Sequence, residues 1–306
     1  MKKSKTLKKI KNWFIYIAAK GMLTLLNSIK RETAFSLFKT IGTLAYYVIP
    51  RERKKTQTHL KLVYPEKSER EISRMAKQVF VNVSCNVVDA FRISRFNKDN
   101  IDQFVSIKGL EKLDAALAQN KGVLALTGHI GNWELLGAYL AIKGYPLHVI
   151  GAPLYDPRID KLVVNNRKNS GLKYIPRGQS TRLILKALKK REMIGILIDQ
   201  DSRHVSGEFI DFLGHEAYTP VGPVVLAQKT KAPLVPLVIH MRSDYHHVIE
   251  IDDIIELENT GNPDLDRVRN TEKCSKAIEK YIRQYPTQWV WMHRRWKTKR
   301  KKIAKT

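Results

Sequence analysis

The sequence predicts an α/β protein: a mixed, largely parallel sheet flanked by helices, preceded by an N-terminal helix suited to a membrane surface and by a helical subdomain. Three observations carry this prediction. Short apolar runs alternate with segments of helical period from residue 104 onward, the first hundred residues carry helical patterns, and the chain begins with a basic, apolar stretch. With 306 residues, 43% of them hydrophobic, the chain is long enough to bury a large core.

The basic excess of the chain is concentrated at its two ends. The chain has 55 Lys and Arg against 29 Asp and Glu, which gives a net charge of +26. Six lysines within the first twelve residues and eight Lys or Arg between Arg294 and Lys305 account for 14 of these charges. Such ends suit an anionic membrane surface or a polyanionic partner. Charge alone fits nucleic acid equally well, and a solvated, charge-rich surface is the plain alternative.

Residues 1–31 are predicted to form a basic membrane-anchoring helix. The apolar stretch from Trp13 to Leu26 is interrupted by Lys20, which makes it marginal as a membrane span. Lys9, Lys20 and Arg31 are spaced by eleven residues and would form one basic stripe on a continuous helix. We expect this helix to lie in a membrane surface or to enter it obliquely; a buried core helix is the alternative.

The rest of the chain divides into three parts by pattern. Residues 32–100 form a helical subdomain, with helices from Glu32 to Ile49, from the basic cluster at 51–55 to Pro65, and from a capping box at Ser68–Glu71 toward Ile93. Residues 101–292 are the α/β core, and residues 293–306 are a basic tail. The expected strands of the core are 104–107, 123–126, 147–150, 194–198, 234–239 and 248–251; the expected helices are 110–118, 133–142, 156–169, 181–190 and 224–229.

One turn of this core carries candidate chemistry. It follows the predicted strand 123–126 and precedes a helix for which Asn132 is the expected N-cap. His129 lies in the turn and Glu134 in the first helical turn, so that a carboxylate could orient the imidazole as a general base. A structural histidine is the alternative; a glycine-rich nucleic-acid clamp would carry basic residues, and this turn has none.

A second polar site follows the predicted strand 194–198, where Asp199 stands at the strand end. Since ligands of parallel sheets bind beyond the carboxyl ends of the strands, His129 and Asp199 are expected to face one crevice. No nucleophile elbow, phosphate loop or dinucleotide fingerprint is present, and Cys85 and Cys274 are too far apart in sequence to indicate a disulfide framework or zinc cluster. We therefore expect no metal and no cofactor, and direct deprotonation of a substrate hydroxyl.

These residues resemble the lipid A biosynthesis acyltransferases, the late lauroyl and myristoyl transferases of lipopolysaccharide synthesis. His129 and Glu134 match the family's His-x4-acid motif. Further matches are Arg167 before Ser170-Gly171, Asp199-Gln-Asp201, Phe212-Leu-Gly214, Ala217-Tyr-Thr219, Gly222 and Trp291-Met-His-Arg-Arg-Trp296. In this order along nearly the whole chain, the matches are specific.

The resemblance implies transfer of a fatty acyl chain, usually from acyl carrier protein, to a hydroxyl of a lipid A precursor glycolipid at the cytoplasmic face of the inner membrane. It implies that His129 is the general base, that Glu134 orients it, and that Arg167 and Asp199 are needed for activity as substrate-binding residues. Arg167 would suit a phosphate of the acceptor, because its planar guanidinium can bind two oxygens. The partners expected are acyl carrier protein, the glycolipid and an anionic membrane surface, and no nucleic acid.

Two rival functions and one ambiguous segment remain open. The same motifs fit an acyltransferase for another membrane glycolipid of the phosphatidylinositol mannoside type, and a non-catalytic basic protein that binds membrane or nucleic acid would share the charge. The segment from Trp289 to Trp296 contains three tryptophans and the basic run His293–Arg295. It is predicted to be an interfacial cluster at lipid headgroups, or alternatively a segment buried by its tryptophans.

Overall fold

The computed structural model describes residues 2–151, 156–176, 180–202 and 205–300, with only the backbone described for residues 2–10 and for Ser180. The lysine side chains at 2–9 and the tail at 301–306 that carry much of the predicted terminal charge therefore lie outside the described residues.

Seven strands form the central sheet, and all neighbouring pairs are parallel except one. The antiparallel pair joins β8 to β9, so the predicted mixed, largely parallel sheet is confirmed. In spatial order the strands are β1 (Val105–Lys108), β9 (His247–Ile251), β8 (Leu234–Met241), β2 (Val123–Thr127), β5 (Met193–Leu197), β3 (Leu147–Gly151) and β4 (Lys173–Pro176).

Helices cover both faces of the sheet, which is why all five residues of β2 are buried. Val123 and Ala125 pack with α5 (Leu110–Ala118) and α6 (Trp133–Ile142) on one face. Leu124 and Leu126 pack on the other face with α8 (Ser180–Lys189), α9 (Gly222–Thr230) and α10 (Pro263–Gln284). The helix α7 (Pro157–Asn169) connects β3 to β4 and contains no buried residue.

Three strands and one α-helix of the structure are absent from the predicted set: β4, α10 and the antiparallel hairpin of β6 (Gly207–Phe212) and β7 (His215–Pro220). In α10 the apolar residues Cys274, Ile278 and Ile282 recur every four residues, but the buried face of the first half of the helix carries Asp266, Asn270 and Thr271, so the apolar pattern covers only part of the helix. β4 has four residues and ends in proline, which leaves too short a run for a strand pattern.

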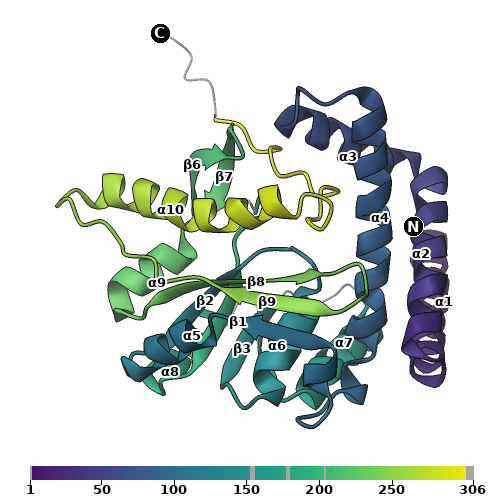
Figure 1. Ribbon diagram of the computed structural model, residues 1–306, viewed down its shortest axis with the longest axis horizontal. Helices are drawn as coiled ribbons and strands as arrows, with labels where there is room; N and C mark the ends of the chain where they lie inside the picture. The colour runs from purple at the N-terminus through teal and green to yellow at the C-terminus, as the bar shows by residue number, and fades with distance from the viewer. Residues whose placement is uncertain (1, 152–155, 177–179, 203–204, 301–306) are drawn as a thin grey trace.

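The N-terminal region is helical, as predicted, and forms the layer at the right of Figure 1. Its helices are α1 (Lys2–Ser28), α2 (Arg31–Val48), α3 (Pro50–Val63) and α4 (Glu69–Phe91), followed by two short 3-10 turns at Ile93–Arg95 and Ile101–Gln103. The predicted capping box is confirmed: the Glu71 N–H donates to Ser68 Oγ, and the Ser68 N–H donates to Glu71 Oε2 at 2.9 Å. In Figure 1, α4 lies between the outer helices α1 and α2 and the rest of the molecule.

The predicted basic stripe on one N-terminal helix is wrong. The chain leaves helical geometry between Ser28 and Arg31, so Arg31 opens α2 instead of continuing α1. Its guanidinium binds the buried Asp89 carboxylate of α4 through two hydrogen bonds of 3.0 and 2.6 Å. Within the described part of the chain, no helix combines the length and the hydropathy that crossing a bilayer requires.

Candidate active site

The turn between β2 and α6, residues 128–132, has the geometry that the sequence predicts. Asn132 caps α6, because its side-chain oxygen accepts a hydrogen bond from the Leu135 N–H at 3.2 Å. Gly131 has a φ of +53°, and a Cβ there would lie 2.2 Å from the Ile239 carbonyl oxygen of β8. Only glycine therefore lets this turn pass so close to the sheet.

His129 is bound by the carboxylate of Asp199. Its Nδ1 lies 2.8 Å from Asp199 Oδ1, and its backbone N–H donates to Oδ2 at 2.7 Å. Trp289 Nε1 donates to the same Oδ2 at 2.7 Å. The Asp199 side chain is fully buried, whereas that of His129 is 21% exposed. The two strand-end residues that the sequence predicts to share a crevice are thus in direct contact.

Three hydrogen bonds keep Asp199 ionised in spite of its burial. Burial acts to raise the pKa of Asp199, but the electrostatic interaction with the His129 imidazole and the hydrogen bonds from the His129 ring and backbone and from Trp289 outweigh it and lower the pKa to about 2. An ionised carboxylate accepts the proton on Nδ1, and this assigns the tautomer in which Nε2 carries a lone pair. An imidazole held in this way can accept a proton at Nε2, which is what a general base requires.

Glu134 has a different partner from the one predicted. Both of its carboxylate oxygens bind Arg167 of α7, with Nε–Oε2 and Nη2–Oε1 distances of 2.8 and 2.5 Å. The hydrogen bond to Glu134 raises the pKa of the Arg167 guanidinium further. The carboxylate at the imidazole of His129 is Asp199, because a separation of five residues across an N-cap turns Glu134 toward α7. The predicted His129–Glu134 pair is therefore replaced by two pairs, His129–Asp199 and Glu134–Arg167.

A cavity of about 170 Å³ adjoins both pairs, and its walls are mainly apolar. Its polar lining comes from Thr127 at the end of β2, from His129, from Glu134 in the first turn of α6 and from Arg167. The remaining lining lies further along α6 and between the strands beneath it: Ala125, Trp133, Leu136, Gly137, Leu140, Leu147, Val149, Ile150, Leu172, Gly195, Leu197 and Leu237. The cavity thus begins at polar groups and continues under α6 among apolar side chains.

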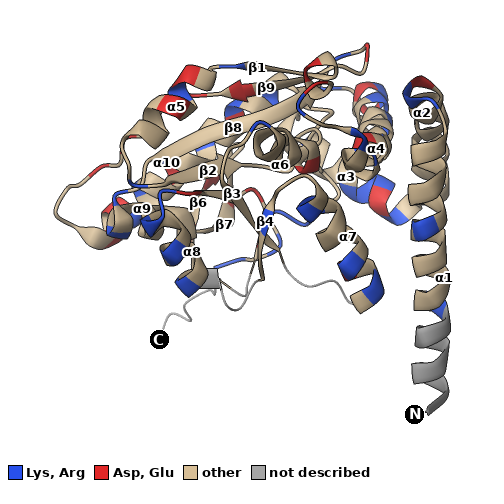
Figure 2. Ribbon diagram, turned by 90° about the horizontal axis from the view of Figure 1, so that it is seen from below, with Lys and Arg blue, Asp and Glu red and all other residues tan. Residues whose placement is uncertain are grey.

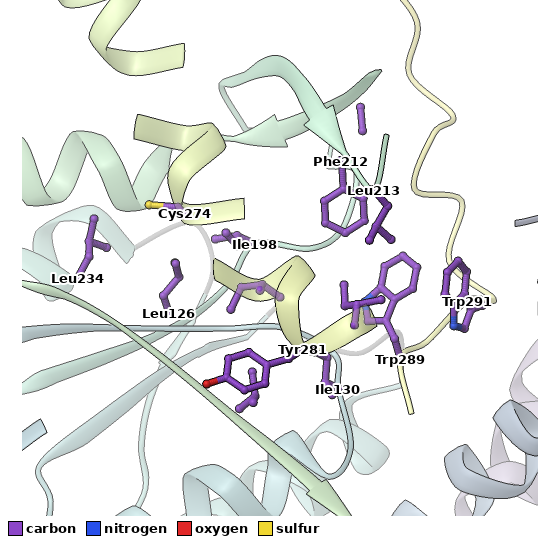
Figure 3. Packing of buried hydrophobic residues seen from close by; sticks show 14 of the residues in the cluster. Leu126, Ile130, Ile198, Phe212, Leu213, Leu234, Cys274, Tyr281, Trp289 and Trp291 are labelled. Atoms are coloured by element: carbon purple, nitrogen blue, oxygen red, sulfur yellow. The ribbon is translucent and has the colours of Figure 1, made fainter. Parts of the chain in front are cut away.

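The C-terminal segment encloses the histidine turn from outside. Val290 N–H donates to the His129 carbonyl at 3.2 Å, and Gly131 N–H donates to the Gln288 carbonyl at 3.0 Å, so Ile130 and Trp289 face each other as in an antiparallel bridge. Trp289 lies beside Trp291 and near Leu213 in Figure 3. Because the two segments lie about 160 residues apart in the sequence, their pairing could not be predicted from the local spacing of residues.

The tryptophans of this segment are buried, so the interfacial interpretation is wrong and the alternative is confirmed. Trp289, Trp291 and Trp296 are 1%, 0% and 8% exposed. Arg295 is also fully buried, donating to the Tyr218 carbonyl and to the Thr219 hydroxyl, and burial lowers its pKa to about 10. The sequence pattern places Trp289 at a lipid interface, whereas in the structure this residue binds Asp199. The only signal for a buried role was its position two residues before Trp291.

The remaining candidates for reactive or metal-binding groups are buried or dispersed. Burial raises the pKa of the Cys85 thiol to about 11 and that of Cys274 to about 12, so neither is an accessible thiolate. Among the described residues, His, Cys, Asp and Glu side chains form no cluster of three that could hold a metal ion.

A histidine oriented by a buried carboxylate, at the carboxyl edge of an α/β sheet and beside an apolar cavity, defines an enzyme site suited to an apolar substrate. The chain belongs to the bacterial lipid A biosynthesis acyltransferase family, whose model matches residues 1–298, and it is therefore an acyltransferase. This membership confirms the resemblance seen in the sequence motifs.

Individual relatives agree with the family. The chain is 27% identical over 289 residues to a lipid A biosynthesis lauroyltransferase of Escherichia coli (strain K12), covering 94% of this chain and 92% of that protein. It is 26% identical over 260 residues to the palmitoleoyltransferase of the same strain, covering 85% and 83%. A phosphatidylinositol mannoside acyltransferase of Mycobacterium tuberculosis (strain ATCC 25618 / H37Rv) is 26% identical over 154 residues, 48% of each chain.

Proposed function

We propose that this enzyme moves a fatty acyl chain from an acyl thioester to a hydroxyl of a lipid A precursor glycolipid, with His129 as the general base. One observation carries the proposal: the His129 imidazole, oriented by Asp199, lines a cavity of about 170 Å³ whose walls are mainly apolar. Family membership and the lauroyl- and palmitoleoyltransferase relatives support the acyl substrate and the glycolipid acceptor.

The proposed chemistry uses few groups. His129 Nε2 takes the proton of the acceptor hydroxyl while the oxygen attacks the thioester carbonyl, which forms a tetrahedral oxyanion. The carbon–sulfur bond then breaks, the ester remains on the acceptor, and the proton passes from His129 to the departing thiolate. Asp199 holds Nδ1–H and stabilises the imidazolium formed in between. A general base of this kind contributes about 10²- to 10⁴-fold in rate.

The start of α6 is the proposed donor for the oxyanion. The helix begins at Trp133, and the ring of this residue lies 4.9 Å from the His129 ring, centroid to centroid. Asn132 caps the Leu135 N–H, so the amides of Trp133 and Glu134 belong to the first helical turn without an intrahelical acceptor. Backbone N–H groups at a helix N-terminus stabilise developing negative charge.

Arg167 is proposed to bind the acceptor. Its Nε and Nη2 are held by Glu134, which leaves Nη1, among the described contacts, for a phosphate or hydroxyl of the glycolipid. Because Arg167 lines the same cavity as His129, an anionic acceptor group bound there would bring its hydroxyl close to the base. Acyl carrier protein is the proposed donor, since its acidic surface suits a chain of net charge +26.

The enzyme is further proposed to work on the cytoplasmic face of the inner membrane. Large apolar side chains are exposed on α1 and α2, and few charged residues interrupt the described part of these helices in Figure 2. The exposed set is Trp13, Phe14, Ile15, Ile17, Met22 and Leu25 on α1 and Leu37, Ile41, Leu44, Tyr47 and Val48 on α2. Contiguous apolar surface of this kind supports contact with lipid.

The test is acyl transfer by the full chain in phospholipid vesicles, with acyl carrier protein and coenzyme A thioesters compared as donors and a lipid A precursor as acceptor. His129→Ala is expected to lose about 10²- to 10⁴-fold. His215→Ala is the control, because that histidine lies on β7 and not in the cavity lining. Transfer by His129→Ala at the rate of the wild type would contradict the mechanism.

A second acceptor is supported by the match to the mycobacterial relative, which covers about half of each chain. In the same assay, a phosphatidylinositol mannoside is offered against the lipid A precursor. A larger kcat/KM for the mannoside would replace the proposed acceptor and leave the role of His129 intact.

A further inference from the structure

A polar stripe runs along the face of α4 that packs on the α/β core. Gln78, Asn82, Asn86 and Asp89 follow one another at intervals of four, four and three residues, which keeps them on one side of the helix. Asn82 and Asn86 are each 8% exposed and Asp89 is fully buried. Buried polar side chains are destabilising unless they are hydrogen-bonded, and each of these four has at least one hydrogen-bond partner.

Asn86 contacts the histidine turn directly. Its Nδ2 donates to the Gly131 carbonyl at 2.7 Å, and its backbone carbonyl accepts from Asn132 Nδ2 at 2.9 Å. Asn132 in turn caps α6 through its side-chain oxygen. One residue of α4 therefore binds Gly131 and Asn132, the two residues that immediately precede α6.

The neighbouring residues of the stripe fix α4 itself. Asp89 accepts from Arg31 at the start of α2 and lies 2.9 Å from His247 Nε2 of β9. The paired charges lower the pKa of Asp89 against the opposing effect of its burial, so this junction is ionic. Arg92, one turn further, donates to the backbone carbonyls at the end of α1. The helix that holds the turn is thus anchored to both outer helices and to the sheet.

The remaining sides of the turn are already restrained by other parts of the chain. Asp199 holds the ring and backbone N–H of His129, and the Gln288–Val290 segment holds the carbonyl of His129 and the N–H of Gly131. The Gly131 carbonyl is held by Asn86. Loss of the Asn86–Gly131 hydrogen bond leaves the Gly131–Asn132 peptide less restrained. This peptide links His129 to the start of α6, which carries the proposed oxyanion donors.

We infer that Asn86 is a positioning residue, through which α4 and the N-terminal helices set the relation between His129 and the start of α6. The inference rests on the proposed function of His129. Because a shift of about 1 Å in reacting groups can reduce a rate about 100-fold, loss of the Asn86 amide lowers kcat more than it raises KM.

The experiment compares Asn86→Ala with Asn82→Ala in the vesicle assay, measuring kcat, KM and Tm. Asn82 is the matched control: it has the same exposure, lies one helical turn away and donates to the carbonyl and hydroxyl of Thr287. Similar losses of Tm are expected, with a decrease of about 10- to 100-fold in kcat for Asn86→Ala alone. Equal kcat values for the two variants would overturn the inference, since Asn86 would then have only a structural role.

Two further variants keep the result decisive. Asn86→Asp preserves the side-chain shape but places a carboxylate oxygen against the Gly131 carbonyl. Its kcat is expected to decrease at least as much as that of Asn86→Ala. It therefore tests the inference if the alanine variant folds poorly. His129→Ala is assayed in parallel. Full activity of His129→Ala overturns the proposed function; an inactive His129→Ala beside Asn86 variants of wild-type kcat overturns the Asn86 inference alone.

Discussion

Two carboxylates beside one cavity have opposite surroundings in this protein. The Asp199 side chain is fully buried and accepts from His129 and Trp289, whereas that of Glu134 is 25% exposed and binds Arg167 with both oxygens. The first holds an imidazole in one tautomer. The second holds a cation that would otherwise be mobile at the cavity edge.

The difference shows why the sequence motif alone misassigns the pair. His129 and Glu134 are close in sequence, but His129 lies in the turn before the N-cap Asn132 and Glu134 in the first turn of α6, and they bind Asp199 and Arg167 respectively. Asp199 reaches His129 from the next strand in the sheet, since β2 and β5 are neighbours in parallel register. Contact across the sheet therefore outweighs proximity along the chain.

The largest expected effect separates the two carboxylates. Asp199→Asn places an N–H either against His129 Nδ1 or against the donors of His129 and Trp289, so the tautomer or the hydrogen bonding is lost. We expect kcat to decrease at least about 10²-fold. Asp201→Asn is the control, because Asp201 does not line the cavity and accepts hydrogen bonds from the backbone N–H and the hydroxyl of Thr298 at 2.7 and 2.8 Å. A decrease no larger than that of the control would refute orientation by Asp199.

A smaller effect is expected at the partly buried Glu134–Arg167 pair. Glu134→Gln and Arg167→Gln each remove a charge-assisted interaction at the cavity edge and should reduce kcat/KM for the glycolipid about tenfold, mainly through KM. Since the two side chains act together, the double variant should be no worse than Arg167→Gln. Additive losses in this double-mutant cycle would show that the residues act independently.

A change in selectivity, with little change in rate, is expected deeper in the cavity. A Cβ on Gly195 of β5 would lie at ordinary contact distances of 3.5 Å or more from Leu147 and Val149. Gly195→Val is therefore expected to fold and to shorten the preferred acyl chain by about two carbons, as the added methyl groups occupy space under α6. Competition between thioesters of different length measures this preference, and an unchanged profile would place the acyl chain elsewhere.

The smallest expected effect concerns stability beside the buried pair. Burial lowers the pKa of His293 from its ordinary 6.5 to about 4. The unfolded chain takes up this proton near pH 6.5 and the folded protein only near pH 4, so stability is lost as the pH falls through this window. His293→Gln is expected to reduce the fall in Tm between pH 6.5 and 4 by about 2 °C. An identical fall in both proteins would mean that His293 is not buried in neutral form.

Most of the sheet could be predicted because its strands are short apolar runs that alternate with segments of clear helical period. The six predicted strands and the capping box at Ser68 follow from local pattern. The helix α10 and the β6–β7 hairpin could not be predicted, because their buried faces are interrupted by charged or polar residues whose burial depends on distant partners. Arg295 is an example: its charge suggests a tail, and its hydrogen bonds to β7 place it in the core.

For the site, the local sequence predicted the histidine turn and its N-cap at Asn132, because each depends on backbone geometry over a few residues. The close approach of Gly131 to Ile239 of β8 is a tertiary contact. Pattern also placed His129 and Asp199 at the same edge. Only tertiary structure decided which carboxylate binds the imidazole and that Trp289 and Asn86 hold the turn. These contacts join segments between 45 and 160 residues apart, and it is the order of strands and the packing of α4 that bring them together.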